Sequence, residues 1–333
     1  MPVPKKDPAF SPRHKLRRAL IHRSLATLAK LGERAIKLEE IEAGLAIQRD
    51  IAYGTAPEHL IDIVKPRHVE GPLPVMLYLH GGAFTTCSRQ THRAVAALYA
   101  SRAGYLVFNA DYRLAPRYRY PAAIEDACAA YRWVAEHCRR YGGDPQRIVI
   151  AGESAGGNLA LGVACAASYV RHEPFAQAVY ALPVPPLGVM PLMPMLQLSD
   201  PTMRLIERKL PDWAIRILEI MAMNYLGERR PSSTDANLFA DPIRLFEATA
   251  PARPFPRVYT AVGTADLCEA DARRLHLAAT RWGIATELHT YPGEPHAFQA
   301  MWWRPGTQQF WDDSMTFLKD IAAVTRRATT TEG

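Results

Sequence analysis

A serine between two glycines carries the strongest chemical signal in this sequence. Ser154 lies in the run GESAG at residues 152–156, directly after a short apolar run at 147–151 and directly before a helical stretch. A serine at a sharp turn from strand to helix adopts strained backbone angles, and glycines beside it relieve the crowding. The N-terminus of the following helix favours negative charge that develops nearby. The pattern predicts a nucleophilic serine, and the alternative is a glycine-rich turn with an unreactive one.

A second glycine-rich run, HGGAF at residues 80–84, also follows an apolar run. Acyl transfer passes through a tetrahedral oxyanion, which needs backbone N–H donors already aimed at it. With Ser154 as the nucleophile, we expect these donors to be the N–H groups of Gly82, Ala83 and Ala155. A plain glycine turn is the alternative for this run.

The histidine that would act as the base is less obvious, because the chain contains 11 histidines. His296 stands out by position, since it follows the last expected strand, at 286–291, in a loop at the same edge of the sheet. His80 is the main competitor. It belongs to the oxyanion segment, however, and we expect His80 and Gly81 to support that loop.

An acid must hold the tautomer of the histidine and stabilise its imidazolium form. Asp266 follows the expected strand at 257–262, and Glu269 and Asp271 are close rivals. We favour Asp266 because it comes first after the strand, whereas the other two begin a helix, where acids also stabilise the N-terminus. The resulting chain order of nucleophile, acid and histidine is the order of α/β-hydrolases.

Short apolar runs alternate with longer helical stretches from about residue 71 onward. Such alternation indicates βαβ units and a mainly parallel central sheet flanked by helices, in which ligands bind at the carboxyl ends of the strands. The expected strands are 75–79, 105–109, 147–151, 176–182, 257–262 and 286–291. The expected helices are 89–102, 122–141, 155–169, 270–282 and 307–324.

Two segments stand outside this alternation. Residues 183–245 begin rich in proline and methionine, continue with a helical stretch at 213–226 and show no pattern of alternating strand residues. The first 50 residues have apolar residues at helical spacing. We expect both segments to form a helical cap over an α/β core. The expected parts are an N-terminal cap segment at 1–50, the first part of the core at 51–182, an inserted cap segment at 183–245 and the second part of the core at 246–333.

The composition is that of a globular domain, with 48% apolar and 22% charged residues in 333. The net charge of +7 is scattered rather than concentrated in a stripe or motif, so a nucleic-acid partner is not expected. The most apolar run, 181–198, contains five prolines, which argues against a stable membrane span.

Five cysteines occur without a CxxC pair or a Cys/His cluster in the sequence. We therefore expect reduced thiols, no metal site and a cytoplasmic location. The N-terminal stretch at 19–31 makes a poor signal-peptide core because polar and basic residues interrupt it, and an organelle transit peptide is the less favoured alternative.

Taken together, these motifs give the chain a resemblance to the hormone-sensitive-lipase-like branch (family IV) of the α/β-hydrolase superfamily, over about residues 70–322. The resemblance implies an α/β-hydrolase fold with a helical cap, and carboxylesterase activity on short and medium acyl chains. Some members of the branch are deacetylases or amide hydrolases. The resemblance rests on HGGAF at 80–84, DYRLAP at 111–116, YPAAIED at 120–126, GGDPQRIVIAGESAGGNLA at 142–160, GTADLCEAD at 263–271 and PHAF at 295–298.

The sequence departs from the family pattern at three places. Ala83 replaces the usual third glycine; it keeps its N–H, and its methyl group is expected to narrow the pocket. The acid loop usually reads Asp-Pro-Leu, but residues 266–268 read Asp-Leu-Cys. Ala297 replaces the usual glycine after the histidine.

These observations predict a serine carboxylesterase that acts on small-molecule acyl esters without a metal or organic cofactor. An amidase or deacetylase, a lactonase or an acyltransferase could use the same residues, and a non-catalytic ligand-binding protein or a basic interaction protein are more distant alternatives. Phe84 and Phe298 are candidates for the wall of an apolar pocket, with core packing as the alternative. Pairing of the edge strand at 286–291 would give a homodimer.

Overall fold

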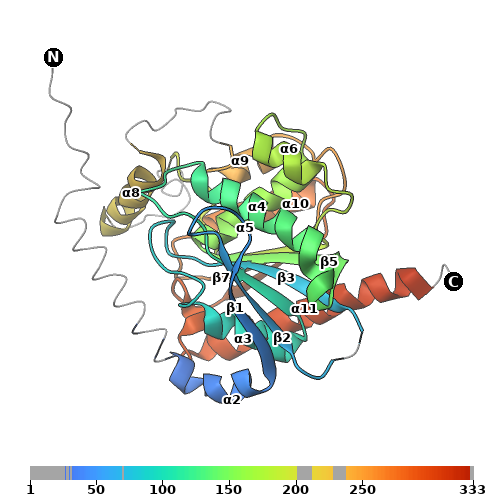
Figure 1. Ribbon diagram of the computed structural model, residues 1–333. Coiled ribbons are helices and arrows are strands. Elements are labelled where there is room, and N and C mark those ends of the chain that lie inside the picture. Colours follow the sequence, from blue (N-terminus) through green and yellow to red (C-terminus); the bar gives the residue numbers. More distant parts are fainter. Residues whose placement is uncertain are drawn as a thin grey trace.

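An eight-stranded sheet runs through the described part of this computed structural model, which comprises residues 27, 30, 32–69, 71–200, 212–227 and 238–330 (Figure 1). The strand order is β1-β2-β4-β3-β5-β6-β7-β8. The strands are β1 Leu45–Ala52, β2 Leu60–Pro66, β3 Leu73–Leu79, β4 Leu106–Ala110, β5 Gly143–Glu153, β6 Gly188–Leu192, β7 Arg257–Gly263 and β8 Thr286–Tyr291.

The sheet is mainly parallel, as expected. From β4 to β8 every neighbouring pair is parallel, whereas β1 pairs with β2, and β2 with β4, in antiparallel fashion. The antiparallel strands β1 and β2 were not expected from the sequence. The prediction that residues 1–50 are helical is therefore wrong for residues 45–50, which begin β1. The centre of β1 is polar and its register with β2 is irregular, so its sequence lacks the regular alternation that is typical of a strand.

The strand predicted at 176–182 is also wrong, because helix α6 occupies Pro174–Tyr180. Pro174 opens this helix, where its missing N–H costs nothing, and Ala176 and Val179 are buried at helical spacing. The true neighbour of β5 is β6, which lies inside the segment 183–245 that was expected to be an insertion. Its proline concealed it, since proline is normally excluded from central strands. The sheet therefore includes residues 188–192.

Helices cover both faces of the sheet (Figure 1). The helices are α2 Leu38–Ala43, α3 Arg93–Ala103, α4 Ala122–His137, α5 Ala155–Ser168, α6 Pro174–Tyr180, α8 Asp212–Leu226, α9 Pro242–Ala248, α10 Glu269–Arg281 and α11 Pro305–Thr330. Two short 3-10 helices are η2 Cys138–Tyr141 and η4 Phe298–Ala300. The helices α4, α5 and α6 lie on one side of the sheet, and α3 and α11 lie on the other (Figure 1).

Strand β3 shows how the sequence builds two cores. Val75, Leu77 and Leu79 point into the core shared with α4 and α5, whereas Met76 and Tyr78 point into the core shared with α3 and α11. All five side chains are at most 1% exposed. A strand that is buried on both faces reads as a continuous apolar run, and burial of each such side chain contributes about 1.5–3 kcal/mol to stability.

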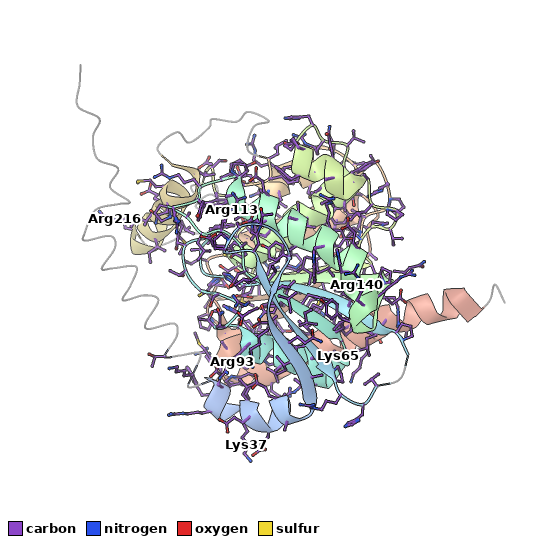
Figure 2. All side chains as sticks on the ribbon, in the orientation of Figure 1. Lys37, Lys65, Arg93, Arg113, Arg140 and Arg216 are labelled. Carbon is purple, nitrogen blue, oxygen red and sulfur yellow. The ribbon has the colours of Figure 1, made fainter. Side chains whose placement is uncertain are left out.

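The basic side chains labelled in Figure 2 come from separate parts of the chain, namely Lys37, Lys65, Arg93, Arg113, Arg140 and Arg216. All five cysteine side chains are buried. None of the helices in the described ranges is long and apolar enough to cross a membrane.

Candidate active site

Ser154 occupies the turn between β5 and α5, with φ 56° and ψ −115°. This left-handed conformation costs a non-glycine residue about 1–3 kcal/mol. The turn is also crowded, because a Cβ atom at Gly156 would lie 2.0 Å from the carbonyl oxygen of Leu79. A Cβ atom at Gly152 would lie 2.5 Å from the carbonyl oxygen of Gly156. The two glycines that flank the serine are therefore required by close backbone approach.

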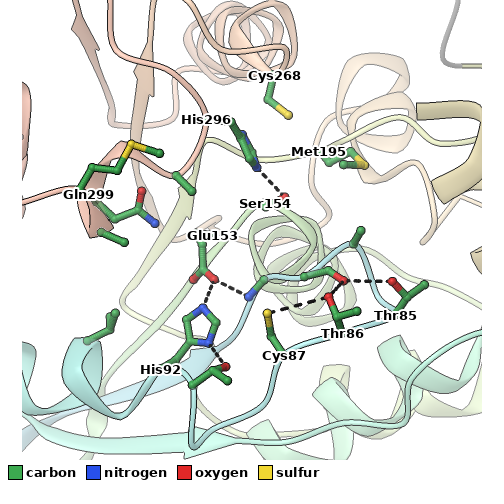
Figure 3. A pocket seen from close by; sticks show the side chains of 18 of the residues that line it. Thr85, Thr86, Cys87, His92, Glu153, Ser154, Met195, Cys268, His296 and Gln299 are labelled. Atoms are coloured by element: carbon green, nitrogen blue, oxygen red, sulfur yellow. Dashed lines mark hydrogen bonds and ion pairs between the residues drawn. The ribbon is translucent and has the colours of Figure 1, made fainter. Parts of the chain in front are cut away.

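The three residues predicted for catalysis lie together, although they come from distant parts of the chain. Figure 3 shows the contact between His296 and Ser154. The Nε2 atom of His296 lies 3.0 Å from the Oγ atom of Ser154. The Nδ1 atom of His296 lies 2.9 Å from each carboxylate oxygen of Asp266. The three side chains follow β5, β7 and β8, whose carboxyl ends meet at one edge of the parallel sheet.

Asp266 controls the charge of His296. Its carboxylate is fully buried and also accepts a hydrogen bond from the backbone N–H of Cys268, at 2.8 Å. Burial lowers the pKa of His296, but the carboxylate of Asp266 and the side chain of Cys268 together raise it by more, so the pKa lies well above the ordinary value for histidine. The arrangement therefore stabilises the imidazolium that would form when His296 takes a proton from Ser154.

The rival acids have other partners. Glu269 pairs with Arg273 on the same helix, at 2.9 Å. Asp271 is fully buried and accepts a hydrogen bond from the backbone N–H of Leu196, at 2.7 Å. Of the three candidate acids, it is Asp266 that contacts the ring of His296.

His80 contacts the loop that is expected to bind the oxyanion. Its Nδ1 atom lies 2.7 Å from the carbonyl oxygen of Gly81, and its ring stacks on Tyr112 with the ring centroids 4.4 Å apart. Burial lowers the pKa of His80 to about 4, so the ring is neutral near pH 7. A neutral ring held in this way suits a structural role in the loop.

Two of the three expected oxyanion donors, Gly82 and Ala83, line the cavity that Ser154 and His296 also line. Gly82 has φ 107° and Ala83 has φ 53°, and a Cβ atom at Gly82 would lie 2.3 Å from the carbonyl oxygen of Thr86. Within the described ranges, the N–H groups of Gly82 and Ala83 donate to no protein acceptor. The tight turn thus leaves two N–H groups available beside the serine.

Sequence reasoning missed a buried ion pair beneath this loop. Glu153, directly before the nucleophile, accepts hydrogen bonds from the N–H of Gly81 and the hydroxyl of Tyr78. Its Oε1 atom lies 2.7 Å from Nε2 of His92 (Figure 3). An acid directly before the predicted nucleophile was the signal in the sequence that could have indicated this pair. The sequence did not show its partner, because His92 is distant in the chain.

The charges of this pair stabilise each other. Burial raises the pKa of Glu153, but His92, together with the hydrogen bonds from Tyr78 and Gly81, lowers it by more, so the net shift is downward. Burial lowers the pKa of His92, but Glu153, together with Ser88 and Asp111, raises it by more, so the net shift is upward. The pair therefore favours its ionised form, and its carboxylate accepts the hydrogen bond from the N–H of Gly81 in the expected oxyanion loop.

A cavity of about 970 Å³ opens above Ser154. Most of its wall is apolar and comes from several elements. Contributing residues include Leu98 of α3, Leu218 and Met221 of α8, and Met301, Trp302 and Trp303 after η4. Gly32 and Glu33 from the N-terminal segment line it as well. Described parts of both expected cap segments thus contribute to this cavity.

The two phenylalanines predicted for the pocket wall do not line this cavity. Phe84 is fully buried and stacks on Tyr225, with the ring centroids 3.9 Å apart. Phe298 is fully buried between Tyr291 and Phe310 in the other core. The pocket prediction is therefore corrected, since both rings turn away from the site and pack in the protein interior.

Residues 76–300 match the family described as alpha/beta hydrolase fold, and the chain belongs to that family. Carboxylesterase NlhH of Mycobacterium tuberculosis is 41% identical over 127 residues, which are 38% of this chain and 40% of that protein, so this match spans less than half of either chain. Esterase LipU of the same organism is 27% identical over 265 residues, covering 78% of this chain and 82% of that protein. Hormone-sensitive lipase of Mus musculus is 30% identical over 52% of this chain and 22% of that protein.

Solved structures show the same fold over nearly the whole chain. Bacterial heroin esterase has a TM-score of 0.75 at 24% identity and covers 96% of this chain and 94% of its own. Esterase LipW from Mycobacterium marinum has a TM-score of 0.74 at 26% identity, with 94% and 91% covered. The expected membership of the hormone-sensitive-lipase-like branch is thereby confirmed.

Proposed function

We propose that this protein is a serine carboxylesterase that cleaves small-molecule acyl esters. The observation that carries the proposal is the continuous contact from Asp266 through His296 to Ser154 at the floor of an apolar cavity. The names of the relatives, which are carboxylesterases, esterases and lipases, support the same class of reaction.

In the proposed reaction, the Oγ atom of Ser154 attacks the ester carbonyl while Nε2 of His296 takes the hydroxyl proton. Asp266 holds the ring by Nδ1 and stabilises its positive charge. The tetrahedral intermediate collapses, the bond to the alcohol breaks, and His296 gives its proton to the leaving oxygen. Water then attacks the acyl-enzyme by the same sequence of proton transfers and frees Ser154.

The oxyanion of each intermediate would be stabilised by backbone N–H groups. Gly82 and Ala83 supply two of them from the loop after β3, and Ala155 supplies a third from the first turn of α5. Such donors are effective because the fold positions them before the reaction begins, and each is worth about 10²–10³-fold in kcat.

The cavity has room for a short or medium acyl chain with a modest alcohol, since pockets of about 300–1,000 Å³ hold drug-sized ligands. Initial rates on p-nitrophenyl esters from acetate to palmitate test this proposal. We expect the rate to peak at short or medium chains. No turnover of any ester by the folded protein would contradict the esterase assignment.

We propose that α8 acts as part of a cap that limits acyl length. Met221→Trp should narrow the cavity and lower the rate on the octanoate ester relative to the acetate ester by about 10-fold, because a bulky ring would exclude the longer chain. Arg216→Trp is the matched control, since Arg216 is exposed on the same helix and does not line the cavity. An unchanged ratio of the two rates in Met221→Trp would refute this assignment.

Glu153 is proposed to position the oxyanion loop through Gly81. Glu153→Gln should lower kcat by about 10–100-fold with a smaller change in KM, because misplaced donors weaken the transition state more than the bound substrate. Steady-state kinetics of hydrolysis measure the split. Glu136→Gln, an exposed change on α4, should leave both constants unchanged. A loss of thermal stability without a loss of kcat would mean that the ion pair is purely structural.

Other acyl acceptors and leaving groups remain open for the same residues. Activities on an ester, an anilide and a lactone, each with and without added alcohol, separate an esterase from an amidase, a lactonase and an acyltransferase. We expect the ester to be the fastest substrate and water to be the main acceptor.

A homodimer and a cytoplasmic location also remain predictions. β8 is an end strand of the sheet, and its free edge could pair with a second copy. Light scattering at two protein concentrations would give the mass in solution, and we expect twice the mass of one chain.

A further inference from the structure

A thiol lies beside the histidine of the proposed active site. Cys268 comes two residues after Asp266, and its side chain lines the same cavity as the ring of His296. One donor atom from each of Asp266, Cys268 and His296 lies within 4.8 Å of the other two. Figure 3 shows the Cys268 side chain next to the ring of His296. The sequence shows no such cluster, because the fold must bring His296 to the loop after β7.

We propose that Asp266, Cys268 and His296 form an inhibitory binding site for a thiophilic divalent cation such as Zn²⁺ or Cd²⁺. Thiolate, imidazole and carboxylate are the three ligand types that zinc uses in proteins. Ligand atoms about 2.0–2.3 Å from one ion lie about 3.3–3.7 Å apart in a tetrahedron, so the donors need to move by only about 1 Å. Soft thiolate ligands select Zn²⁺ and Cd²⁺ over Mg²⁺ and Ca²⁺.

The surroundings allow such an ion to enter and be neutralised. Cys268 and His296 both line the 970 Å³ cavity, so an ion can arrive from solvent and a water molecule can take the fourth position. The carboxylate and the thiolate together balance the two positive charges of the ion. The bound complex is therefore neutral, which lowers the cost of holding it next to buried groups.

The ion would replace a proton that catalysis needs. Asp266 faces Nδ1 of His296, so an ion held by Asp266 and Cys268 binds Nδ1 as well. The S–H bond of Cys268 breaks, its sulfur binds the ion, and that proton leaves to solvent. The proton of Nδ1 moves to Nε2. Nε2 then donates a hydrogen bond to Ser154 and can no longer accept its proton, so the base is lost.

The protein offers its own control for this site. Cys87 is a second buried cysteine that lines the same cavity, but it lies in the oxyanion loop and its sulfur contacts the hydroxyl of Thr86 at 3.9 Å. Among the described residues, the group of side chains that could hold a metal ion contains Cys268 but not Cys87. A reagent or cation that attacks or binds thiols in general would therefore affect both cysteines, whereas a cation at the proposed site would depend on Cys268 alone.

Direct binding is tested by titrating the full-length, metal-free protein with Cd²⁺ and following the ultraviolet absorption of cadmium bound to thiolate. We expect one equivalent per chain, retained in Cys87→Ala and weakened at least about 10-fold in Cys268→Ala. Cys268→Ser gives the same test with nearly unchanged side-chain volume if the alanine variant folds poorly. Equal binding by the wild type and both Cys268 variants would overturn the site.

Inhibition by the cation rests on the proposed esterase function, whereas binding of the cation to the site does not. Zn²⁺ should inhibit ester hydrolysis reversibly, with full recovery after chelation, and Cys268→Ala should need at least about 10-fold more Zn²⁺ for half inhibition of its own metal-free rate. Equal sensitivity of the variant and the wild type would overturn the inhibitory role. A protein that binds Cd²⁺ through Cys268 but hydrolyses no ester would keep the site and disprove the esterase assignment.

Discussion

Ser154→Ala is expected to lower kcat for ester hydrolysis by about 10⁶-fold, because it removes the attacking oxygen and leaves only binding and the oxyanion donors. The fold should persist, since the hydroxyl is replaced by hydrogen while the backbone bonds of the turn remain, including the one from the N–H of Asn158 to the carbonyl of Ser154. Hydrolysis of p-nitrophenyl butyrate gives the rate, and circular dichroism gives the fold.

A buried serine elsewhere provides the matched control. Ser314 is fully buried in α11, and its hydroxyl lies 3.4 Å from the hydroxyl of Tyr259, away from the cavity. Ser314→Ala should keep its activity within a few-fold. A fluorophosphonate probe should label the wild type at Ser154 and leave Ser154→Ala unlabelled. Retention of more than about one hundredth of the activity in Ser154→Ala would contradict its role as nucleophile.

Asp266→Asn is expected to lower kcat by about 10⁴-fold, because asparagine neither holds the required tautomer of His296 nor stabilises its imidazolium. The pH profile should change as well. His296 must be neutral to act as a base, so activity rises as the pH passes above its pKa. The carboxylate raises that pKa while burial lowers it, so removal of the charge should move the acid limb to lower pH.

Asp271→Asn is the control for this prediction, because Asp271 is an equally buried rival in the same region whose carboxylate bonds to the backbone of Leu196. Its kcat should stay within a few-fold of the wild type, and its acid limb should not move. The profile of kcat/KM against pH is measured for both variants. If Asp271→Asn rather than Asp266→Asn lost the activity, the assignment of the acid would be wrong.

The residues of the candidate site could be predicted because their signals are local. The glycines around Ser154 are required by contacts within the turn and with the neighbouring strand. Loops that follow parallel strands meet at one edge, so the positions of Asp266 and His296 after β7 and β8 were enough to bring them to the serine. Backbone N–H donors need only a tight turn after a strand, and the glycine-rich run at 80–84 predicts such a turn.

Several elements could not be predicted because they depend on partners far along the chain. β6 contains a proline and lies in a run that resembles an insertion, and only its place between β5 and β7 makes it a strand. The ion pair of Glu153 and His92 exists because α3 packs where its N-terminal residue faces the oxyanion loop. Each of these features is set by docking of elements rather than by local spacing.

Phe84 illustrates the difference between what the local sequence predicts and what only the packing of the whole fold decides. By itself the sequence determined the proposed chemistry, namely a strained serine turn, a candidate oxyanion loop and an acid and a histidine after later strands, because these depend on backbone geometry within a few residues. Only the tertiary structure decided that Phe84 stacks on Tyr225, that α8 lines the cavity and that Cys268 lies against His296. The direction of a side chain is settled by the elements that pack around it, and those elements come from distant segments.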